Sequence, residues 1–139
     1  MSSKTFKHTI PNLLVIDDDE IIWVLIKDML HELELVDQMQ TFSDGDTALH
    51  YLSELTQGEA PPLIVLDLNL PYLDGFEFLE IYARDLWMRF PQTVIYILTT
   101  SVRESDRQQT LKYPFVKDFI SKPMKLEQLK AMLDPYVRS

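Results

Sequence analysis

Three carboxylates directly follow short apolar runs of the chain. Asp17 and Asp18 come after the run at 12–16, and Asp67 comes after the run at 63–66. Short apolar runs of this kind predict strands that are buried on both faces, as the strands of a parallel sheet are. Open α/β sheets carry their chemistry at the carboxyl ends of their strands, so we expect the three carboxylates to meet at one edge of a sheet.

Three carboxylates that lie close together repel one another. The repulsion is relieved either by protonating one of them or by binding a cation. Because the ligands would all be oxygens, with no histidine or cysteine, the cluster favours Mg²⁺ or Mn²⁺. The plainer alternative is that Asp17 and Asp18 cap a helix and that Asp67 only ends a strand, but Asp19 can cap that helix alone.

Two further strand ends carry groups that could bind a phosphoryl oxygen. Thr99 and Thr100 follow the run at 93–98, and Lys122 follows the run at 115–120. The hydroxyl of Thr99 is a hydrogen-bond donor, and the ammonium group of Lys122 is a mobile point charge. Together with the carboxylates, these residues predict a site at which a phosphoryl group is transferred to a carboxylate.

The elements that would position these groups alternate along the chain. We predict strands at 12–16, 36–42, 63–67, 93–98 and 115–120, and helices at 19–34, 46–55, 75–90, 102–112 and 126–136. The apolar residues expected to face the sheet from the first three helices are Ile22, Ile26, Met29, Leu30, Leu33, Ala48, Leu49, Leu52, Phe78, Leu79, Tyr82 and Leu86. The alternation predicts an α/β fold with a single doubly wound sheet of five parallel strands, helices on both faces and right-handed crossovers.

The composition limits the classes of function. The net charge of -9 and the lack of a basic cluster argue against nucleic-acid binding. The absence of cysteine excludes disulfides, thiolate metal sites and cysteine nucleophiles. We expect residues 1–11 to form a polar leader that is no signal peptide, and residues 12–139 to form one domain. No apolar run approaches the roughly 18 residues of a membrane span, so a cytoplasmic location is expected.

Several stretches in this order and at this spacing resemble one known family. They are Val-Ile-Asp-Asp-Asp at 15–19, Ser-Asp-Gly at 43–45, Asp-Leu-Asn-Leu-Pro at 67–71 with Asp74 and Gly75, Leu-Thr-Thr at 98–100, and Phe-Ile-Ser-Lys-Pro at 119–123. Over residues 12–137 the sequence is similar to the receiver domain of bacterial two-component response regulators. The resemblance implies a flavodoxin-like (βα)5 fold with the strand order 2-1-3-4-5.

The resemblance also implies which residues carry out the chemistry. Asp67 would be the phosphoacceptor for a histidine kinase. Mg²⁺ would be held by the carboxylates of Asp17, Asp18 and Asp67 and by the backbone carbonyl of Asn69. The protein would then be a phosphoacceptor rather than an enzyme, although it would contribute to magnesium-dependent phosphotransfer and to its own dephosphorylation.

The other matched residues would bind the phosphoryl group or respond to it. Thr99 and Lys122 would contact the phosphoryl oxygens, and Thr100 would leave access to the acceptor. Thr99 and Phe119 would form the switch, in which the aromatic ring turns inward when the threonine moves. The bond between Lys122 and Pro123 would be cis.

The implied partner is a sensor histidine kinase or a histidine phosphotransfer protein. Its helix would dock over the helix at 19–34 and the loop after the last strand. The residues expected to contact it are Glu20, Trp23, Lys27 and Pro123, although Trp23 could instead pack against the helix at 126–136.

We expect a single-domain regulator with no output domain, so its output would be a protein–protein surface. A homodimer through the regions at 102–112, 115–120 and 126–136 is one form of it, because Tyr113, Phe115 and Tyr136 would place aromatic rings there. The family usually has Gly-Ala where this chain has Tyr-Pro-Phe-Val at 113–116, which leaves the shape of that loop open. This departure and the Thr-Thr-Ser at 99–101 resemble the regulators of bacterial phytochrome kinases.

Two other classes of protein compete with this interpretation. Asp17 and Asp19 have the Asp-x-Asp spacing of haloacid dehalogenase-type phosphohydrolases, but the Gly or Thr that should follow and the substrate-capping insertion are missing. A flavodoxin-like flavin binder needs a phosphate-binding loop after its first strand, where this chain has four acidic residues that would repel phosphate.

Overall fold

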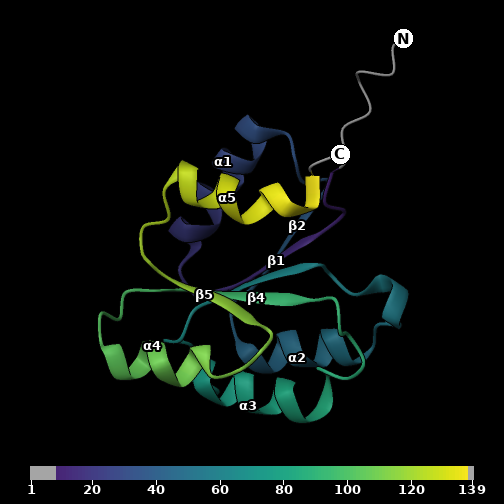
Figure 1. The fold of residues 1–139 in the computed structure, drawn as a ribbon, viewed down its shortest axis with the longest axis vertical. Helices are drawn as coiled ribbons and strands as arrows, with labels where there is room; N and C mark the ends of the chain where they lie inside the picture. Colours follow the sequence, from purple (N-terminus) through teal and green to yellow (C-terminus); the bar gives the residue numbers. More distant parts are fainter. Residues whose placement is uncertain (1–8, 138–139) are drawn as a thin grey trace.

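The computed structural model describes residues 9–137 and consists of one parallel sheet with helices on both faces (Figure 1). The strands are β1 (Leu13–Ile16), β2 (Met39–Phe42), β3 (Leu63–Leu66), β4 (Val94–Thr99) and β5 (Val116–Ser121). The helices are α1 (Glu20–Leu33), α2 (Gly45–Ser53), the short 3-10 helix η2 (Gln57–Glu59), α3 (Gly75–Asp85), α4 (Glu104–Leu111) and α5 (Leu126–Val137). The strand order is β2-β1-β3-β4-β5, so the predicted fold class is confirmed.

Side chains alternate between the two faces of the sheet and build two separate cores. Leu14 and Ile16 of β1 pack beneath α2 and α3, and Leu13 and Val15 pack beneath α1 and α5. The β1 and β3 strands are buried along their whole length, as their continuous apolar sequences predict. Figure 1 shows α1 and α5 on one side of the sheet and α2, α3 and α4 on the other.

Aspartates begin the three helices that follow β1, β2 and β3. The carboxylates of Asp19, Asp44 and Asp74 each accept a hydrogen bond from a backbone N–H in the first turn of the following helix. These caps satisfy donors that have no partner within the helix. Helices α1 and α2 therefore begin within four residues of the ends of β1 and β2, whereas a longer loop joins β3 to α3.

Helix α3 ends five residues earlier than predicted, because turns replace the helix after Asp85. The backbone N–H of Trp87 donates to the carbonyl of Tyr82, five residues back, which widens the last turn. The guanidinium of Arg89 donates to the carbonyls of Ser53 and Leu55, and this holds the segment against the end of α2. The apolar pattern extends to Phe90 because this residue is buried, although it lies beyond the end of the helix.

Two other predicted boundaries also need correction. The second strand was predicted at 36–42 but is regular only from Met39, and Val36 forms an isolated bridge with Ile10. Ile10 belongs to the predicted polar leader, yet it is 1% exposed and part of the core beneath α1. The rest of that leader, residues 1–8, lies outside the described residues.

The segment at 113–116 forms a tight turn into β5. The backbone N–H of Val116 donates to the carbonyl of Tyr113, and that of Ile95 donates to the carbonyl of Phe115. Phe115 is 3% exposed, and its ring contacts those of Tyr82, Trp87 and Tyr113. The bulky residues that replace Gly-Ala therefore close the core above α3.

This arrangement corrects the idea that aromatic rings gather on the surface of α4, β5 and α5. Phe115 is buried, and Tyr113 stacks on it. Tyr136 packs on the core beneath α1 and α5, across the sheet from both. The homodimer thus loses the observation that suggested it, and it stays a prediction.

Candidate functional site

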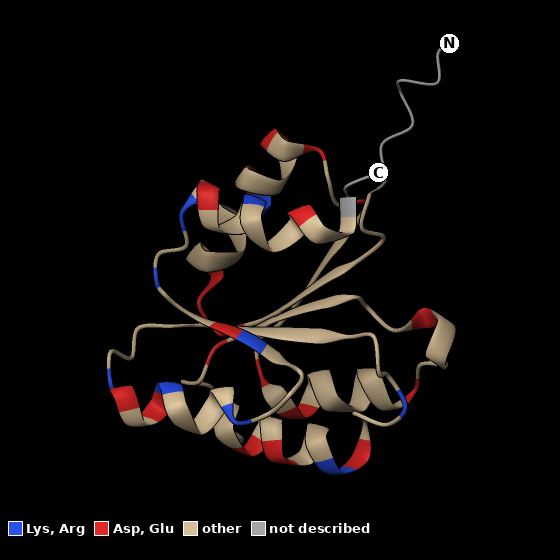
Figure 2. Cartoon of the chain, viewed as in Figure 1, with Lys and Arg blue, Asp and Glu red and all other residues tan. Residues whose placement is uncertain are grey.

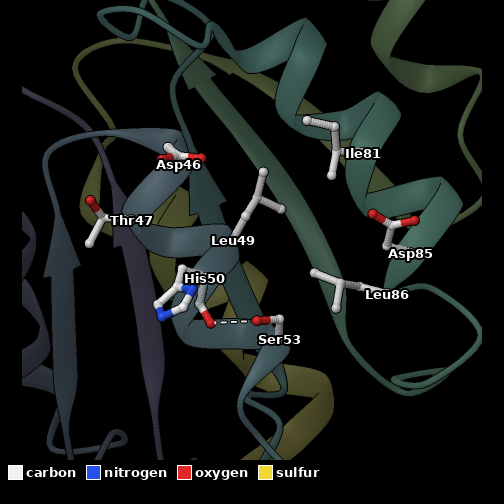
Figure 3. A pocket seen from close by; sticks show the side chains of 8 residues that line it. All are labelled: Asp46, Thr47, Leu49, His50, Ser53, Ile81, Asp85 and Leu86. Atoms are coloured by element: carbon white, nitrogen blue, oxygen red, sulfur yellow. Dashed lines mark hydrogen bonds between the residues drawn. The ribbon is translucent and has the colours of Figure 1, made fainter.

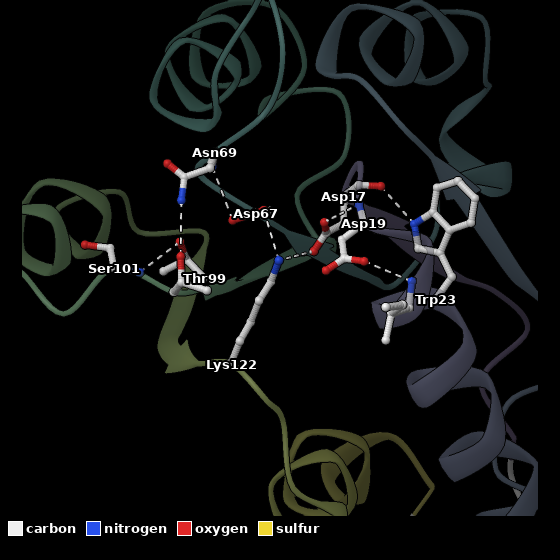
Figure 4. Close-up of polar contacts among 10 residues, drawn as sticks. Asp17, Asp19, Trp23, Asp67, Asn69, Thr99, Ser101 and Lys122 are labelled. Carbon is white, nitrogen blue, oxygen red and sulfur yellow. Dashed lines mark hydrogen bonds and ion pairs between the residues drawn. The ribbon is translucent and has the colours of Figure 1, made fainter.

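The predicted site residues converge at the carboxyl edge of the sheet (Figure 4). Asp17 follows β1, Asp67 follows β3, Thr99 ends β4 and Lys122 follows β5. They come together because all five strands are parallel and β1, β3 and β4 are neighbours. Asp17, Asp67 and Thr99 are all nearly inaccessible to solvent, with exposed fractions of 2%, 3% and 0%.

The three acidic residues form a cluster whose donor atoms suit a hard cation. One carboxylate oxygen from each of Asp17, Asp18 and Asp67 lies within 4.8 Å of the others. Asp18 is exposed, so the cluster opens to solvent on its side. An all-oxygen set that is partly open fits Mg²⁺ or Mn²⁺, since Mg²⁺ keeps several of its waters and takes only a few carboxylates.

Lys122 is the counter-ion inside the cluster. Its Nζ lies 2.8 Å from Oδ2 of Asp17 and 3.1 Å from Oδ2 of Asp67. Burial raises the pKa of the Asp17 carboxyl above its usual value, against the opposing effect of Lys122. Burial alone would lower the pKa of Lys122, but the contacts with Asp17 and Asp67 outweigh it and raise that pKa.

The backbone of the first acidic loop is held at several points. The N–H of Asp19 donates to Oδ1 of Asp17 at 2.9 Å, while the side chain of Asp19 caps α1. The indole Nε1 of Trp23 donates to the main-chain carbonyl of Asp17, also at 2.9 Å (Figure 4). Sequence reasoning did not find the Trp23 contact, because no spacing rule links an indole to a carbonyl six residues earlier.

The loop after β3 packs closely around Asp67. The N–H of Asn69 donates to Oδ1 of Asp67 at 3.2 Å, and its side-chain amide reaches Oγ1 of Thr100 at 3.4 Å. A Cβ atom at Gly75 would lie 2.6 Å from the carbonyl oxygen of Asp67. Glycine is therefore required at the start of α3, because the helix approaches the backbone of the acidic strand end.

The end of β4 is joined both to β5 and to the loop before α4. The N–H of Lys122 donates to the carbonyl of Thr99, and the N–H of Ser101 donates to Oγ1 of Thr99 at 3.4 Å. Ser101 also donates through Oγ to Oδ2 of Asp106 on α4 at 2.6 Å. The bond between Lys122 and Pro123 is cis, as predicted. Sequence reasoning missed the contact between Ser101 and Asp106, although both residues are polar and five positions apart.

The remaining predicted residues lie around the rim of the site or behind it. Glu20, Lys27 and Pro123 are exposed, whereas Trp23 is half-buried. Phe119 is half-buried and packs against the core beneath α2 and α3. Lys and Arg are scattered over the described chain (Figure 2).

A groove between α2 and α3 lies away from this chemistry (Figure 3). Its walls include Asp46, His50, Ile81 and Asp85. Apart from the cluster at Asp17, Asp18 and Asp67, the described residues contain no group of three side chains arranged to hold a metal. The carboxyl edge of the sheet is therefore the candidate site.

A five-stranded sheet of this order, with three acids, a threonine and a lysine at its carboxyl edge, defines a flavodoxin-like signalling domain. A model of the family described as "response regulator receiver domain" matches residues 13–134, so the chain belongs to the response regulator receiver domains. This match leaves the haloacid dehalogenase alternative without support. No helix among the described residues is long and apolar enough to cross a membrane.

Individual proteins agree with the family match. The osmosensing histidine protein kinase SLN1 of Saccharomyces cerevisiae is 31% identical over 130 residues, which are 93% of this chain but only 10% of that protein. A two-component response regulator from Cytophaga hutchinsonii has the same fold, with a TM-score of 0.84 at 24% identity, covering 92% of this chain and 97% of that one.

Two further solved structures of response regulators are also similar. The phosphorylated cyanobacterial phytochrome response regulator RcpA is 28% identical, with a TM-score of 0.72 and 91% of each chain covered. The Mn²⁺-bound form of response regulator Rcp1 is 26% identical, with a TM-score of 0.70 and 90% of each chain covered.

Proposed function

We propose that this receiver domain accepts a phosphoryl group on Asp67 from the phosphohistidine of a sensor histidine kinase or a histidine phosphotransfer protein. The observation that carries the proposal is the convergence of Asp17, Asp18 and Asp67 around the ammonium group of Lys122. Asp67 lies at the centre of this arrangement, after the middle strand of the sheet.

In the proposed reaction a carboxylate oxygen of Asp67 attacks the phosphorus atom. The bond between phosphorus and the histidine nitrogen breaks, and its electron pair returns to the imidazole, so the product is an acyl phosphate. Mg²⁺ would be held by the carboxylates of Asp17, Asp18 and Asp67 and by the carbonyl of Asn69. When bound, it would supply positive charge that offsets the negative charge of the phosphoryl group.

Lys122 and Thr99 are the proposed ligands of the phosphoryl oxygens. Lys122 already contacts Oδ2 of Asp67, so its charge is in place before the transfer begins. Oγ1 of Thr99 accepts the N–H of Ser101, which leaves the threonine proton free to donate to a phosphoryl oxygen. A movement of Thr99 toward the phosphoryl group would alter this contact and, through Ser101, the bond to Asp106 on α4.

The proposed output is a change in the surface near α4 and β5. Phe119 lies on β5, next to the strand that ends in Thr99, and is half-buried. Its ring would turn inward when Thr99 moves. The homodimer remains one possible form of this output, and light scattering with and without beryllofluoride would test it. The similarity to the phytochrome response regulator RcpA supports a phytochrome-type kinase as the phosphoryl donor. We further propose that the transfer takes place in the cytoplasm.

Intact-mass spectrometry after incubation with acetyl phosphate and Mg²⁺ tests the central proposal. We expect wild-type protein to gain one phosphoryl group and Asp67→Asn to gain none. Asp37→Asn is the matched control, because Asp37 is exposed and lies outside the cluster. Equal labelling of wild type and Asp67→Asn would reject the assignment of Asp67.

A further inference from the structure

Trp23 forms a direct link between α1 and the acidic loop. Its side chain is half-buried in the first turn of the helix, and it packs against the core beneath α1 and α5. Its Nε1 donates to the main-chain carbonyl of Asp17 at 2.9 Å. In Figure 4 the indole nitrogen points at this carbonyl.

This carbonyl stands where the sheet ends and the acidic loop begins. The N–H of Asp17 still donates to the carbonyl of Phe42 on β2, and the carbonyl of Ile16 accepts from the N–H of Asp67. The carbonyl of Asp17 lies one residue further on, and it receives the indole N–H. Trp23 thus extends the hydrogen bonding of the strand by one residue.

The orientation of the Asp17 carbonyl determines the position of the Asp18 backbone. The peptide unit between Asp17 and Asp18 is planar, so holding its oxygen also sets the direction of the Asp18 N–H and Cα. The Asp17 carboxylate has its own partners in Asp19 and Lys122. Among the described residues none donates a hydrogen bond to the Asp18 carboxylate, so the placement of Asp18 depends on its backbone.

We propose that Trp23 is a positioning residue of the phosphotransfer site: its indole N–H holds the Asp17 carbonyl and so keeps the Asp18 carboxylate in the cluster with Asp17 and Asp67. This inference rests on the proposed function for the role of the three carboxylates. It assigns Trp23 an internal task, beyond the partner contact expected from the resemblance.

The rival explanation is that Trp23 only fills space between α1 and α5. Removing the N–H while keeping the shape of the ring separates the two explanations. 3-Benzothienylalanine does this, because a sulfur atom replaces the indole nitrogen in a side chain of nearly the same size. Trp23→Phe is the simpler second variant and loses both the N–H and part of the ring.

Isothermal titration with Mg²⁺ alone measures the effect. We expect both variants at position 23 to bind Mg²⁺ about tenfold more weakly than wild type, the low end for loss of a group that orients a metal ligand. Trp87→Phe is the matched control, because Trp87 is the other tryptophan, is also half-buried and packs on Phe115 in the opposite layer. Its affinity should stay within about twofold of wild type.

Thermal melts of the metal-free proteins complete the test. The benzothienylalanine protein should melt within a few degrees of wild type, roughly the change that loss of one hydrogen bond causes. Wild-type affinity in that protein would overturn the proposal, even if Trp23→Phe bound poorly, since packing alone would then explain the loss. Absence of Mg²⁺ binding by wild type would instead refute the proposed function itself.

Discussion

The ammonium group of Lys122 lies closer to Asp17, at 2.8 Å, than to Asp67, at 3.1 Å. The lysine is therefore shared between the proposed acceptor and a proposed metal ligand. Both carboxylates are almost completely buried, so each depends on this one ammonium group for compensation of its charge.

Lys122→Met should destabilise the metal-free protein, because two buried carboxylates lose their counter-ion. We expect the free energy of unfolding in urea to fall by about 2–4 kcal/mol, and Mg²⁺ to restore part of the loss. Lys117→Met is the control, since Lys117 is exposed on the same strand and should change stability by no more than about 0.5 kcal/mol. An equal loss in both variants would contradict this role of Lys122.

Asp18→Asn should separate metal binding from folding. The affinity for Mg²⁺ and the labelling by acetyl phosphate should both fall about tenfold or more, because a charged ligand is lost. The melting temperature without metal should stay the same or rise, since repulsion with Asp17 and Asp67 is relieved. Asp28→Asn, an exposed change within α1, is the control and should leave affinity unchanged. A clear fall in the metal-free melting temperature of Asp18→Asn alone would speak against the repulsion.

The exposed face of α1 provides a test of partner docking. Ile21, Val24 and Leu25 are 67%, 57% and 44% exposed although they are apolar, and they lie on one side of the helix. Val24→Ser should slow phosphotransfer from the kinase about fivefold or more, because an apolar contact is lost, and leave labelling by acetyl phosphate unchanged.

Met88→Ser serves as the comparison for Val24→Ser. Met88 is 86% exposed and lies in the turns after α3, so its loss should leave both reactions at the wild-type rate. If Val24→Ser slowed both phosphotransfer from the kinase and labelling by acetyl phosphate, the substitution would have disturbed the fold, and the docking prediction would be wrong.

The buried phenol of Tyr82 should make the free energy of unfolding fall at alkaline pH. Burial raises the pKa of its phenol from 10.0 to about 12. Below the ordinary pKa of 10.0 the phenol is neutral in the folded and unfolded states, and its contribution to the free energy of unfolding is fully present. Above that pKa the phenol of the unfolded state loses its proton first. The contribution is therefore lost as the pH rises through the folded-state pKa of about 12. The loss amounts to roughly 2–3 kcal/mol.

Urea unfolding near neutral pH and at about pH 11 measures this contribution, within the interval between the two pKa values. Tyr82→Phe should lose less stability over this range than wild type does. Tyr72→Phe is the control, since Tyr72 is 99% exposed and should follow the wild-type curve. Identical curves for wild type and Tyr82→Phe would show that the buried phenol does not govern the alkaline loss.

The sequence was sufficient for the sheet and for the acidic edge, because both follow from local patterns. The apolar runs of β1 and β3 are buried on both faces and contain no polar residues that would suggest another structure. Each is followed directly by an aspartate, Asp17 or Asp67. Parallel strands then bring these ends together whatever the details of the loops. The same logic explains why the proposed ligands are adjacent in the structure.

Features that depend on contacts between distant segments could not be predicted in this way. Helix α3 stops at Asp85 because a distant arginine contact and buried rings favour turns. The register between β4 and β5 shifts at Ile95 and Tyr96, so Val116 and Phe119 pack on the same core although they are three residues apart. Regular alternation predicts opposite faces for that spacing.

The assembly of the site from several strand ends has a consequence for synthesis on the ribosome. Lys122 is 55 positions beyond Asp67 and joins it only when β5 has paired with β4. Contacts of such long sequence separation form late, because the chain between the two residues must first be closed into a loop. A nascent chain that has emerged only through β4 already exposes the acidic residues without their lysine. Phosphotransfer competence should therefore arise at the last step of folding, when the carboxyl-terminal strand docks.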